Sequence, residues 1–456
     1  MMDTATAARV VTGRVVGDNV PFLRVTTDTR ELRPGDLFVA LKGDRFDGHD
    51  FVVQALAGGA AAAMVASERA DALGGALIAV ADPLAALGQL AAHWRSRFEL
   101  PLAVVVGSNG KTTVKEMTAA ILGSHFGRDA VLATQGNLNN AIGLPLTLLR
   151  LAPAHRAAVI ELGMNHRGET RELVAIAQPT IVVVNNAQRE HLEFMTSVAD
   201  VASEHADAVA ALRPGGVAVV NADDASADVW RDAAYRVGAR VVTFGFAPGA
   251  DVTASVRLHA DGSALALNTQ DGHAHVKVGV PGLHMARNAL AATATAMAAG
   301  ASLVAVKRGL GAFRAVAGRL VARHAASGAL VLDDTYNANP DSMRAAIDVL
   351  AVAPGIRYLV MGDMGEVGMQ GPAFHREIGE YARERGIARL YAIGDLAREA
   401  VAAFGAGAAH FDAIETLQDA LRRDAQTGVA LLVKGSRFMR MERVVASLTG
   451  ESGGAH

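Results

Sequence analysis

The residues Gly107-Ser108-Asn109-Gly110-Lys111-Thr112-Thr113 follow directly on the apolar run Leu102–Val106, and this combination is the strongest indication of the chain's fold. An apolar strand that runs into a glycine turn and then into Lys-Thr predicts a phosphate-binding loop. In such a loop, backbone N–H groups and the start of the next helix face an anion. Lys111 adds a positive charge, and Thr112 offers a hydroxyl to a magnesium ion. The stretch therefore predicts a site for a nucleoside triphosphate.

This loop is shorter than the usual phosphate-loop pattern. Val105 stands where that pattern has its first glycine, so that Gly107 and Gly110 are only three positions apart. The same string also fits an ordinary strand-to-helix turn with a surface lysine. The residues by themselves leave this alternative open.

Composition limits the class of protein. A chain of 456 residues is long enough for two to four domains, and its 51% apolar and 20% charged residues are typical of a globular protein. The net charge of −3 gives no basic field for nucleic acid, and the lack of cysteine excludes disulfides, thiolate metal sites and a cysteine nucleophile. Residues 1–19 do not resemble a signal peptide. No apolar stretch reaches the roughly 18–20 residues of a membrane span, so we expect a cytoplasmic protein.

Strand and helix patterns divide the chain into three blocks, which we predict to be domains over residues 1–98, 99–315 and 316–456. The first block has short strands at 36–41 and 76–80 and helices at 48–57 and 84–98. The second has strands at 102–106, 157–161, 180–185 and 217–221, helices at 112–122, 168–177 and 197–212, and an antiparallel excursion at 250–280. The third has strands at 329–333, 357–361, 389–393 and 429–433, and helices at 340–350, 372–386, 396–404 and 437–448. Buried strands that alternate with helices predict parallel sheets covered on both faces.

The predicted fold class is therefore α/β with three domains. A central phosphate-loop ATPase domain with a parallel sheet lies between a smaller N-terminal α/β domain and a C-terminal Rossmann-like domain. Ligands of such sheets collect at the carboxyl ends of the strands.

Polar side chains end several of the predicted strands. Glu161 ends the strand 157–161, where a carboxylate suits Mg²⁺ beside a phosphate loop, although most such residues simply face water. His191 follows the next strand and has three possible roles: to bind metal, to orient a phosphate or only to pack. Both residues are candidates for a metal site.

Three further polar clusters are candidates for substrate contacts. The turn Gln135–Asn140 supplies four carboxamides that suit a polar substrate, or that only cap a loop. The segment Asp333–Pro340 follows a buried strand, and its Asp334 could accept hydrogen bonds from a ribose or a bound amine. The structural alternative is that this segment only caps the N-terminus of the next helix. Lys434-Gly435-Ser436-Arg437 offers positive charge where the second and third blocks meet.

Across nearly all of its length the chain resembles the Mur ligases of peptidoglycan synthesis. The strings that carry the resemblance, besides the phosphate loop, are Thr26-Thr27-Asp28-Thr29-Arg30, Leu37–Gly43, Phe46–Phe51, Gly136–Asn140, Gly282-Leu283-His284 with Asn288, Gly318-Arg319, Tyr336–Met343, and Gly362–Gly368 with His375. The phosphate loop alone would fit any Mur ligase or a folylpolyglutamate synthetase. The Tyr-Asn-Ala-Asn-Pro-Asp-Ser and Gly-Asp-Met segments resemble the branch that adds D-alanyl-D-alanine to UDP-N-acetylmuramoyl-tripeptide. The Asp-Asn-Pro-Arg string of many diaminopimelate-adding ligases is absent.

The resemblance implies an ATP-dependent ligase that forms an acyl phosphate, with Mg²⁺, and that works as a monomer. Alternatives are a Mur ligase that adds a single amino acid, diaminopimelate or lysine, and a nucleotide-regulated binding protein without turnover. The implied catalytic residues are Lys111, Glu161 and His191. ATP is assigned to Gly107, Ser108, Asn109, Gly110, Lys111, Thr112, Thr113, His284, Asn288, Arg319 and Asp334. The UDP-linked substrate is assigned to Thr26, Asp28, Thr29, Arg30, Asp47, Gly48, His49, Asn137, Asn139 and Asn140. The dipeptide side is assigned to Asn337, Asn339, Lys434 and Ser436, and the metal to Thr112, Glu161 and His191, with His205 as a further candidate.

His205 marks a departure from the family. Many Mur ligases have at this position a lysine that carbon dioxide converts to a carbamate, which helps to hold a second Mg²⁺. No lysine occurs here between Lys115 and Lys277, so no shift of the alignment restores it. One possibility is that His205 replaces the carbamate by ligating the metal or by hydrogen bonding to its water. The other is that His205 only packs or forms hydrogen bonds within the protein.

Overall fold

The computed structural model describes residues 1–259 and 261–450. The N-terminal unit is built on a five-stranded sheet in the order β2-β7-β6-β5-β4, in which only β2 is antiparallel to its neighbour. Its strands are β1 (Met2–Asp3), β2 (Arg14–Val16), β3 (Pro21–Phe22), β4 (Arg24–Thr26), β5 (Asp36–Val39), β6 (Ala62–Ala66) and β7 (Leu77–Val80). Its helices are α1 (Thr4–Val10), η1 (Thr29–Glu31), η2 (Gly48–Phe51), α2 (Val52–Ala57), α3 (Ser67–Ala70) and α4 (Pro83–Arg95).

The central unit contains a six-stranded, wholly parallel sheet in the order β13-β12-β11-β8-β10-β9. The strands are β8 (Leu102–Val106), β9 (Val131–Ala133), β10 (Ala157–Glu161), β11 (Ile181–Val184), β12 (Val217–Asn221) and β13 (Arg240–Phe244). The chain passes from β8 to one edge and back, then continues on the other side of β8. The end of β8 is therefore the point where the strand order reverses, which is where doubly wound sheets bind ligands.

Helices cover both faces of this sheet, as its apolar strands require. Alternate residues of β8 lie in different cores: Ala103 and Val105 in one, Leu102, Val104 and Val106 in the other. The helices are α5 (Lys111–Phe126), η3 (Arg128–Ala130), α6 (Gly143–Leu148), α7 (Glu169–Ala177), α8 (Val198–Ala210), α9 (Ala227–Arg236), α10 (Leu283–Ala298) and α11 (Leu303–Ala312). The predicted antiparallel excursion is confirmed as the sheet β14 (Thr253–His259), β15 (Gly262–Thr269) and β16 (Gly272–Val278).

The C-terminal unit has a six-stranded sheet in the order β17-β18-β22-β19-β20-β21, in which only β17 is antiparallel. The strands are β17 (Val321–His324), β18 (Leu330–Asp334), β19 (Ile356–Gly362), β20 (Arg389–Ile393), β21 (Ala408–Phe411) and β22 (Val429–Lys434). The helices are α12 (Pro340–Ala351), η4 (Gly368–Gln370), α13 (Gly371–Glu384), α14 (Ala397–Phe404), α15 (Ile414–Asp424), η5 (Arg437–Met439) and α16 (Glu442–Thr449).

One predicted helix, 437–448, was wrong at its start. Residues 437–439 form a 3₁₀ turn, Arg440 takes a left-handed conformation with φ of 51°, and α16 begins only at Glu442. The backbone N–H of Ser436 donates to Asp363 O, and its hydroxyl accepts from Gly365 N. These bonds hold the segment in a loop that no helical pattern in the sequence reveals.

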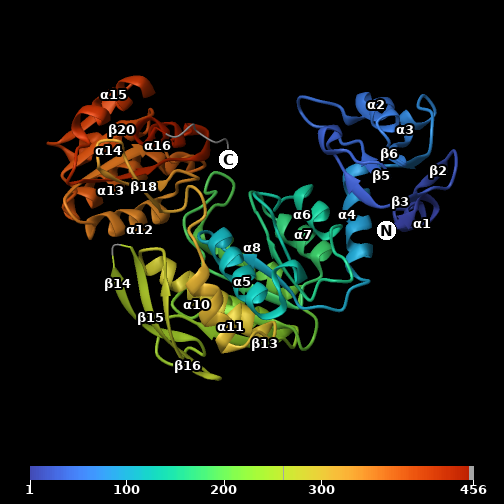
Figure 1. Cartoon of the computed structure of the whole chain (residues 1–456), viewed down its shortest axis with the longest axis horizontal. Coiled ribbons are helices and arrows are strands. Elements are labelled where there is room, and N and C mark those ends of the chain that lie inside the picture. Colours follow the sequence, from blue (N-terminus) through green and yellow to red (C-terminus); the bar gives the residue numbers. More distant parts are fainter. Residues whose placement is uncertain (260, 451–456) are drawn as a thin grey trace.

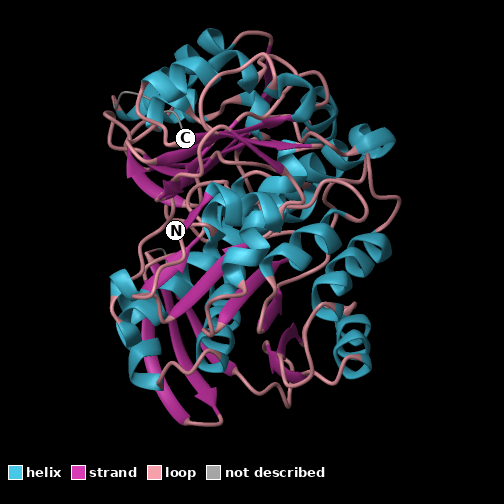
Figure 2. Cartoon of the chain, turned by 90° about the vertical axis from the view of Figure 1, so that its right-hand side faces the viewer, coloured by secondary structure: helices cyan, strands magenta, loops and turns pink. Residues whose placement is uncertain are grey.

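The N-terminal and C-terminal units lie apart, each joined to the central unit, with α4 leading from the first unit toward the second (Figure 1). Helices flank the sheets of the molecule (Figure 2), so the predicted three-domain α/β class is confirmed. Among the described residues, no helix has the length and apolar character needed to cross a membrane.

Candidate active site

The phosphate loop has the backbone that an anion site needs. Gly107 and Gly110 have φ of 138° and 82°, a region that favours glycine, and α5 begins at Lys111. The first bond of that helix runs from Val114 N to Gly110 O, which leaves the preceding N–H groups without partners inside the helix. A Cβ atom at Gly110 would lie 2.5 Å from Asn288 Oδ1. Close packing and positive φ therefore both require glycine here.

Lys111 is held within the site and is not a surface lysine. Its side chain is 16% exposed, and Nζ donates to Gly107 O at 2.6 Å and Ser108 O at 3.3 Å. Nζ also lies 3.5 Å from Glu190 Oε2. The alternative of a plain turn with a solvent-facing lysine does not fit these contacts.

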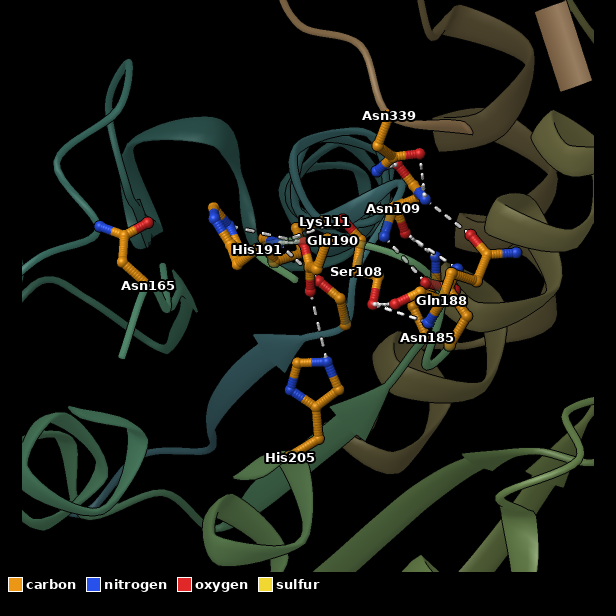
Figure 3. A network of polar contacts seen from close by, with 12 residues as sticks. Ser108, Asn109, Lys111, Asn165, Asn185, Gln188, Glu190, His191, His205 and Asn339 are labelled. Carbon is orange, nitrogen blue, oxygen red and sulfur yellow. Dashed lines mark hydrogen bonds and ion pairs between the residues drawn. The ribbon is translucent and has the colours of Figure 1, made fainter. Parts of the chain in front are cut away.

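The segment that follows β11 holds the phosphate loop in place (Figure 3). Asn109 N donates to Asn186 Oδ1 at 2.8 Å, and Asn185 Nδ2 donates back to Asn109 O at 2.7 Å. Gln188 accepts from Asn109 Nδ2 at 2.7 Å and donates through its backbone to Ser108 Oγ at 2.8 Å. The carboxyl ends of two neighbouring strands thus form one rigid wall of the site.

Glu161 ends β10 beside this wall and fits the predicted metal role. It is 4% exposed, Oε1 accepts from Asn139 Nδ2 at 2.9 Å, and Oε2 has no hydrogen-bond partner. A buried carboxylate oxygen without a partner suits a cation. Within the described part of the chain, no three His, Cys, Asp or Glu side chains form a metal cluster by themselves. Mg²⁺ commonly binds through one or two protein ligands, water and substrate phosphates, so Thr112 and Glu161 fit such an ion.

The C-terminal unit brings cations to the same place. Lys434 Nζ, at the end of β22, donates to Asp334 Oδ2 at 2.6 Å and Asn337 O at 2.8 Å. Burial lowers the pKa of Lys434, and Asp334 opposes that shift. Arg319 lies over the Tyr336 ring at 4.0 Å, and its Nη2 is 3.4 Å from Thr112 Oγ1 of the central unit.

Asn339 is the N-cap of α12, which is the structural alternative named above for the segment Asp333–Pro340. It caps α12, where its Oδ1 accepts from Ser342 N at 2.8 Å. Its Nδ2 also donates to Asn109 Oδ1 at 2.9 Å, across to the phosphate loop. Ser436 Oγ donates to Ala338 O at 3.1 Å. Asn339 and Ser436, two of the four residues assigned to the dipeptide side, are therefore already engaged in bonds within the protein.

These groups face one cavity of about 920 Å³. The predicted residues that line it are Ser108, Asn109, Gly110, Lys111, Thr112, Asn137, Asn139, Asn140, Glu161, His191, Arg319, Asn337, Asn339, Lys434 and Ser436. The predicted residues Gly107, Thr113, Asn288 and Asp334 do not line the cavity. Gly107 and Thr113 belong to the phosphate loop itself, Asn288 accepts from Asn185 Nδ2, and Asp334 pairs with Lys434.

His284 lies in a second, mainly apolar cavity of about 350 Å³. Burial lowers the pKa of His284 to about 4, and Asp334 and Lys434 are close enough to affect it. Leu332 lines this cavity two residues before Asp334, and Asp334 pairs with Lys434 of the large cavity, so the second cavity lies near the cationic end of the first. Leu330, Leu332 and Val349 of the C-terminal unit contribute to its lining.

Of the ten residues assigned to the UDP-linked substrate, Asn137, Asn139 and Asn140 line the large cavity. The other seven lie in the N-terminal unit, at or after the ends of β4 and β5, and do not line it. Arg30 makes a two-point ion pair with Asp28. Asp47 Oδ1 lies 2.6 Å from His49 Nδ1, while His49 Nε2 accepts from Ala66 N at 2.9 Å. His49 thus carries its proton on Nδ1 and ties the turn to β6. Thr26 Oγ1 donates to the Asp28 carbonyl at 3.2 Å. The remaining two assigned residues, Thr29 and Gly48, begin η1 and η2 of the same region.

Sequence reasoning missed Arg189 and Glu190, which directly precede His191. Arg189 pairs with Asp341 and Glu377 of the C-terminal unit at 2.6 Å each. Glu190 is 7% exposed and faces Lys111. Their position after the end of β11, beside a histidine already singled out, was the available signal.

Backbone strain is concentrated beside these residues. His191 and Glu366 are non-glycine residues with φ of 49° and 58°. They face each other, with His191 Nδ1 at 2.6 Å from Glu366 Oε2, and His191 holds the pKa of Glu366 below its usual value. Left-handed backbone at such residues is common at functional sites.

Comparisons with known proteins agree with this geometry. Three family descriptions match: "Mur ligase family, catalytic domain" at residues 22–95, "Mur ligase middle domain" at 105–296, and "Mur ligase, glutamate ligase domain" at 318–437. The UDP-N-acetylmuramoyl-tripeptide–D-alanyl-D-alanine ligase of Escherichia coli (strain K12) is 44% identical over 445 residues, which are 96% of each chain.

Solved structures give the same result. MurF from Acinetobacter baumannii superposes with a TM-score of 0.90 at 35% identity, over 98% of this chain and 99% of that one. MurF ligase from Thermotoga maritima in complex with ADP has a TM-score of 0.82 at 28% identity, over 94% and 97%. The chain therefore belongs to the Mur ligase family, within its MurF group of UDP-N-acetylmuramoyl-tripeptide–D-alanyl-D-alanine ligases.

Proposed function

We propose that the chain couples D-alanyl-D-alanine to UDP-N-acetylmuramoyl-tripeptide through an acyl phosphate formed in the large cavity. As a member of the MurF group it is an ATP-dependent ligase of peptidoglycan synthesis. The observation that carries the mechanism is the meeting of the phosphate loop, Glu161 and the C-terminal cations Arg319 and Lys434 in one cavity. We place the reaction in the cytoplasm. We further propose that the enzyme works as a monomer.

ATP overcomes the poor reactivity of a carboxylate toward an amine. The substrate carboxylate attacks the γ-phosphorus, ADP leaves, and the acyl phosphate then accepts the amine while inorganic phosphate departs. Positioning and charge neutralisation do most of the work in phosphoryl transfer. Lys111 and the N–H groups at the start of α5 are placed to hold the β- and γ-phosphates.

Mg²⁺ would be held by Thr112, Glu161 and His191, and it would neutralise charge on the transferred phosphoryl group. Asn139 orients the Glu161 carboxylate, which fixes the direction of the free Oε2 atom. Arg319 and Lys434 would add positive charge from the C-terminal unit. Closure of that unit over ATP therefore completes the site.

The two ends of the substrates extend from this centre. The apolar cavity beside His284 suits an adenine ring, because it lies near the Asp334–Lys434 pair next to the phosphate site. The UDP end belongs to the N-terminal unit through Thr26, Asp28, Thr29, Arg30 and the turn Asp47–His49. The amide turn at 137–140 would contact the muramoyl-peptide, and Asn337 and Ser436 would contact the dipeptide. We place the boundaries between the three units at residues 98 and 315.

The test is phosphate release over a matrix of UDP-muramoyl-peptides and amine acceptors. Tripeptides ending in diaminopimelate and in lysine are each offered with D-alanyl-D-alanine, diaminopimelate, lysine or no acceptor. We expect turnover only with D-alanyl-D-alanine. Turnover with a single amino acid would support the alternative ligase, and ATP binding without phosphate release would support a binding protein.

A further inference from the structure

One buried carboxylate at the centre of the site has no role in the mechanism above. Glu190 is surrounded by Lys111, His191 and His205 (Figure 3). Its Oε2 lies 3.5 Å from Lys111 Nζ and 3.8 Å from His191 Nε2, while Oε1 lies 3.7 Å from His205 Nε2. Oε1 makes no hydrogen bond. Burying such a carboxylate is costly unless a further group pairs with it.

His205 lies on α8 and faces this carboxylate without a hydrogen bond to it. It is 1% exposed, and neither ring nitrogen has a hydrogen-bond partner. One nitrogen of a neutral imidazole has a free lone pair, which is the usual metal-binding form of histidine.

The separations around Glu190 are compatible with ligands that share one cation. Two ligands about 2.1 Å from a shared octahedral ion lie about 3.0 Å apart at right angles and about 4.2 Å apart when opposite. The separations from Glu190 to His191 and His205 fall between these limits and exceed hydrogen-bond length. In the proposed reaction Lys111 pairs with phosphates, which releases Glu190 Oε2 from that lysine.

We propose, resting on the proposed function, that Glu190 is a ligand of the divalent cation that accompanies ATP. His205 would position that cation from α8, either directly through its free nitrogen or through one of the cation's waters. The segment between Lys115 and Lys277 has no lysine to carry a carbamate. Glu190 would supply from its own side chain the buried carboxylate that the carbamate supplies in lysine-bearing relatives. The chain would then need no carbon dioxide.

The first test measures cation binding and needs no turnover. Mn²⁺ is titrated into the full chain with ADP and followed by electron paramagnetic resonance. Glu190→Gln, which keeps the size of the side chain, should weaken Mn²⁺ binding roughly 10- to 100-fold. Glu193→Gln is the matched control, because Glu193 is an exposed glutamate three positions away. Its Mn²⁺ affinity should equal that of the wild type.

The second test separates positioning from packing at His205. His205→Gln keeps a polar group near the place of Nε2 and should retain Mn²⁺ affinity within about threefold, whereas His205→Leu should lose about tenfold or more. If Glu190→Gln does not fold, the Mn²⁺ affinities of these two His205 variants still test whether a cation binds at this place. Equal affinities for the two variants would show that His205 only packs.

Two outcomes would overturn the inference. One is unchanged Mn²⁺ affinity in Glu190→Gln together with a raised KM for ATP, which would make Glu190 only a counter-ion for Lys111. The other is wild-type activity that depends on added bicarbonate. Failure of the proposed function would look different: the wild-type chain would bind Mn²⁺ and ADP but release no phosphate with both substrates present.

Discussion

Arg189 connects the phosphate site to the C-terminal unit, and we expect its loss to loosen that connection. Its guanidinium makes a two-point contact with Asp341 and a second one with Glu377. Its backbone N–H also donates to Asp341 Oδ2 at 2.9 Å. Arg189 belongs to the loop after β11, whereas both carboxylates belong to helices of the C-terminal unit. In Arg189→Met the fold of each unit should persist while their association weakens.

The structure sets the size of this effect. The three side chains are 23%, 23% and 32% exposed, so that the carboxylates regain water when the arginine is removed. Hydrogen bonds to charged groups contribute about 1.5–3 kcal/mol, and fully exposed ion pairs about 0.2–1 kcal/mol. For this half-buried pair of contacts we expect a loss of about 2 kcal/mol, or about 30-fold in the equilibrium between closed and open arrangements.

The assay combines the KM for ATP with small-angle X-ray scattering of the nucleotide-free chain. Arg319 and Lys434 reach ATP only when the units associate, so Arg189→Met should raise the KM for ATP about 10- to 30-fold and enlarge the radius of gyration. Arg344→Met is the matched control. Arg344 contacts the same Glu377 at 3.1 Å but lies within the C-terminal unit. If both variants give the same KM and the same scattering, Arg189 does not control closure.

Three further outcomes are expected. Lys111→Ala should abolish ligation while circular dichroism shows a folded chain, because the transferred phosphoryl group loses its main cation; near-normal turnover would contradict this role. Gly110→Ala should remove ATP binding in a calorimetric titration, since the new Cβ would lie 2.5 Å from Asn288 Oδ1 at a positive φ; retained binding would show that the turn can adjust. Hydrogen bonds from His49, and then from Arg69, lower the pKa of Asp47 from 3.8. The stabilising contribution of Asp47 is therefore complete above pH 3.8 and is lost as pH falls toward its lower folded pKa. Asp47→Asn should be less stable than the wild type at pH 6 in urea unfolding, with the difference shrinking below pH 4; a constant difference would refute this linkage.

Most strands of the central sheet and the phosphate loop could be predicted from local sequence patterns. β8, β10 and β12 begin and end as the apolar runs predict, because a strand buried on both faces must be apolar throughout. The glycines at 107 and 110 are equally local, since their positive φ angles belong to one turn. Local pattern did not reveal the short edge strands β9 and β21, or the loop that delays α16 to Glu442.

Local patterns did not predict which polar groups meet in the site, because these groups come from distant parts of the chain. Glu190 became a candidate metal ligand only because its carboxylate lies beside Lys111 and His205, which come from two different helices. Asn339, which we expect to touch substrate, lines the cavity and also caps α12 and pairs with Asn109, two hundred and thirty positions away. Apolar periodicity records which face of an element is buried, whereas hydrogen bonds between distant loops leave no periodic trace in the chain. The fold could therefore be predicted from sequence, while the pairing of charges in the site required the packed structure.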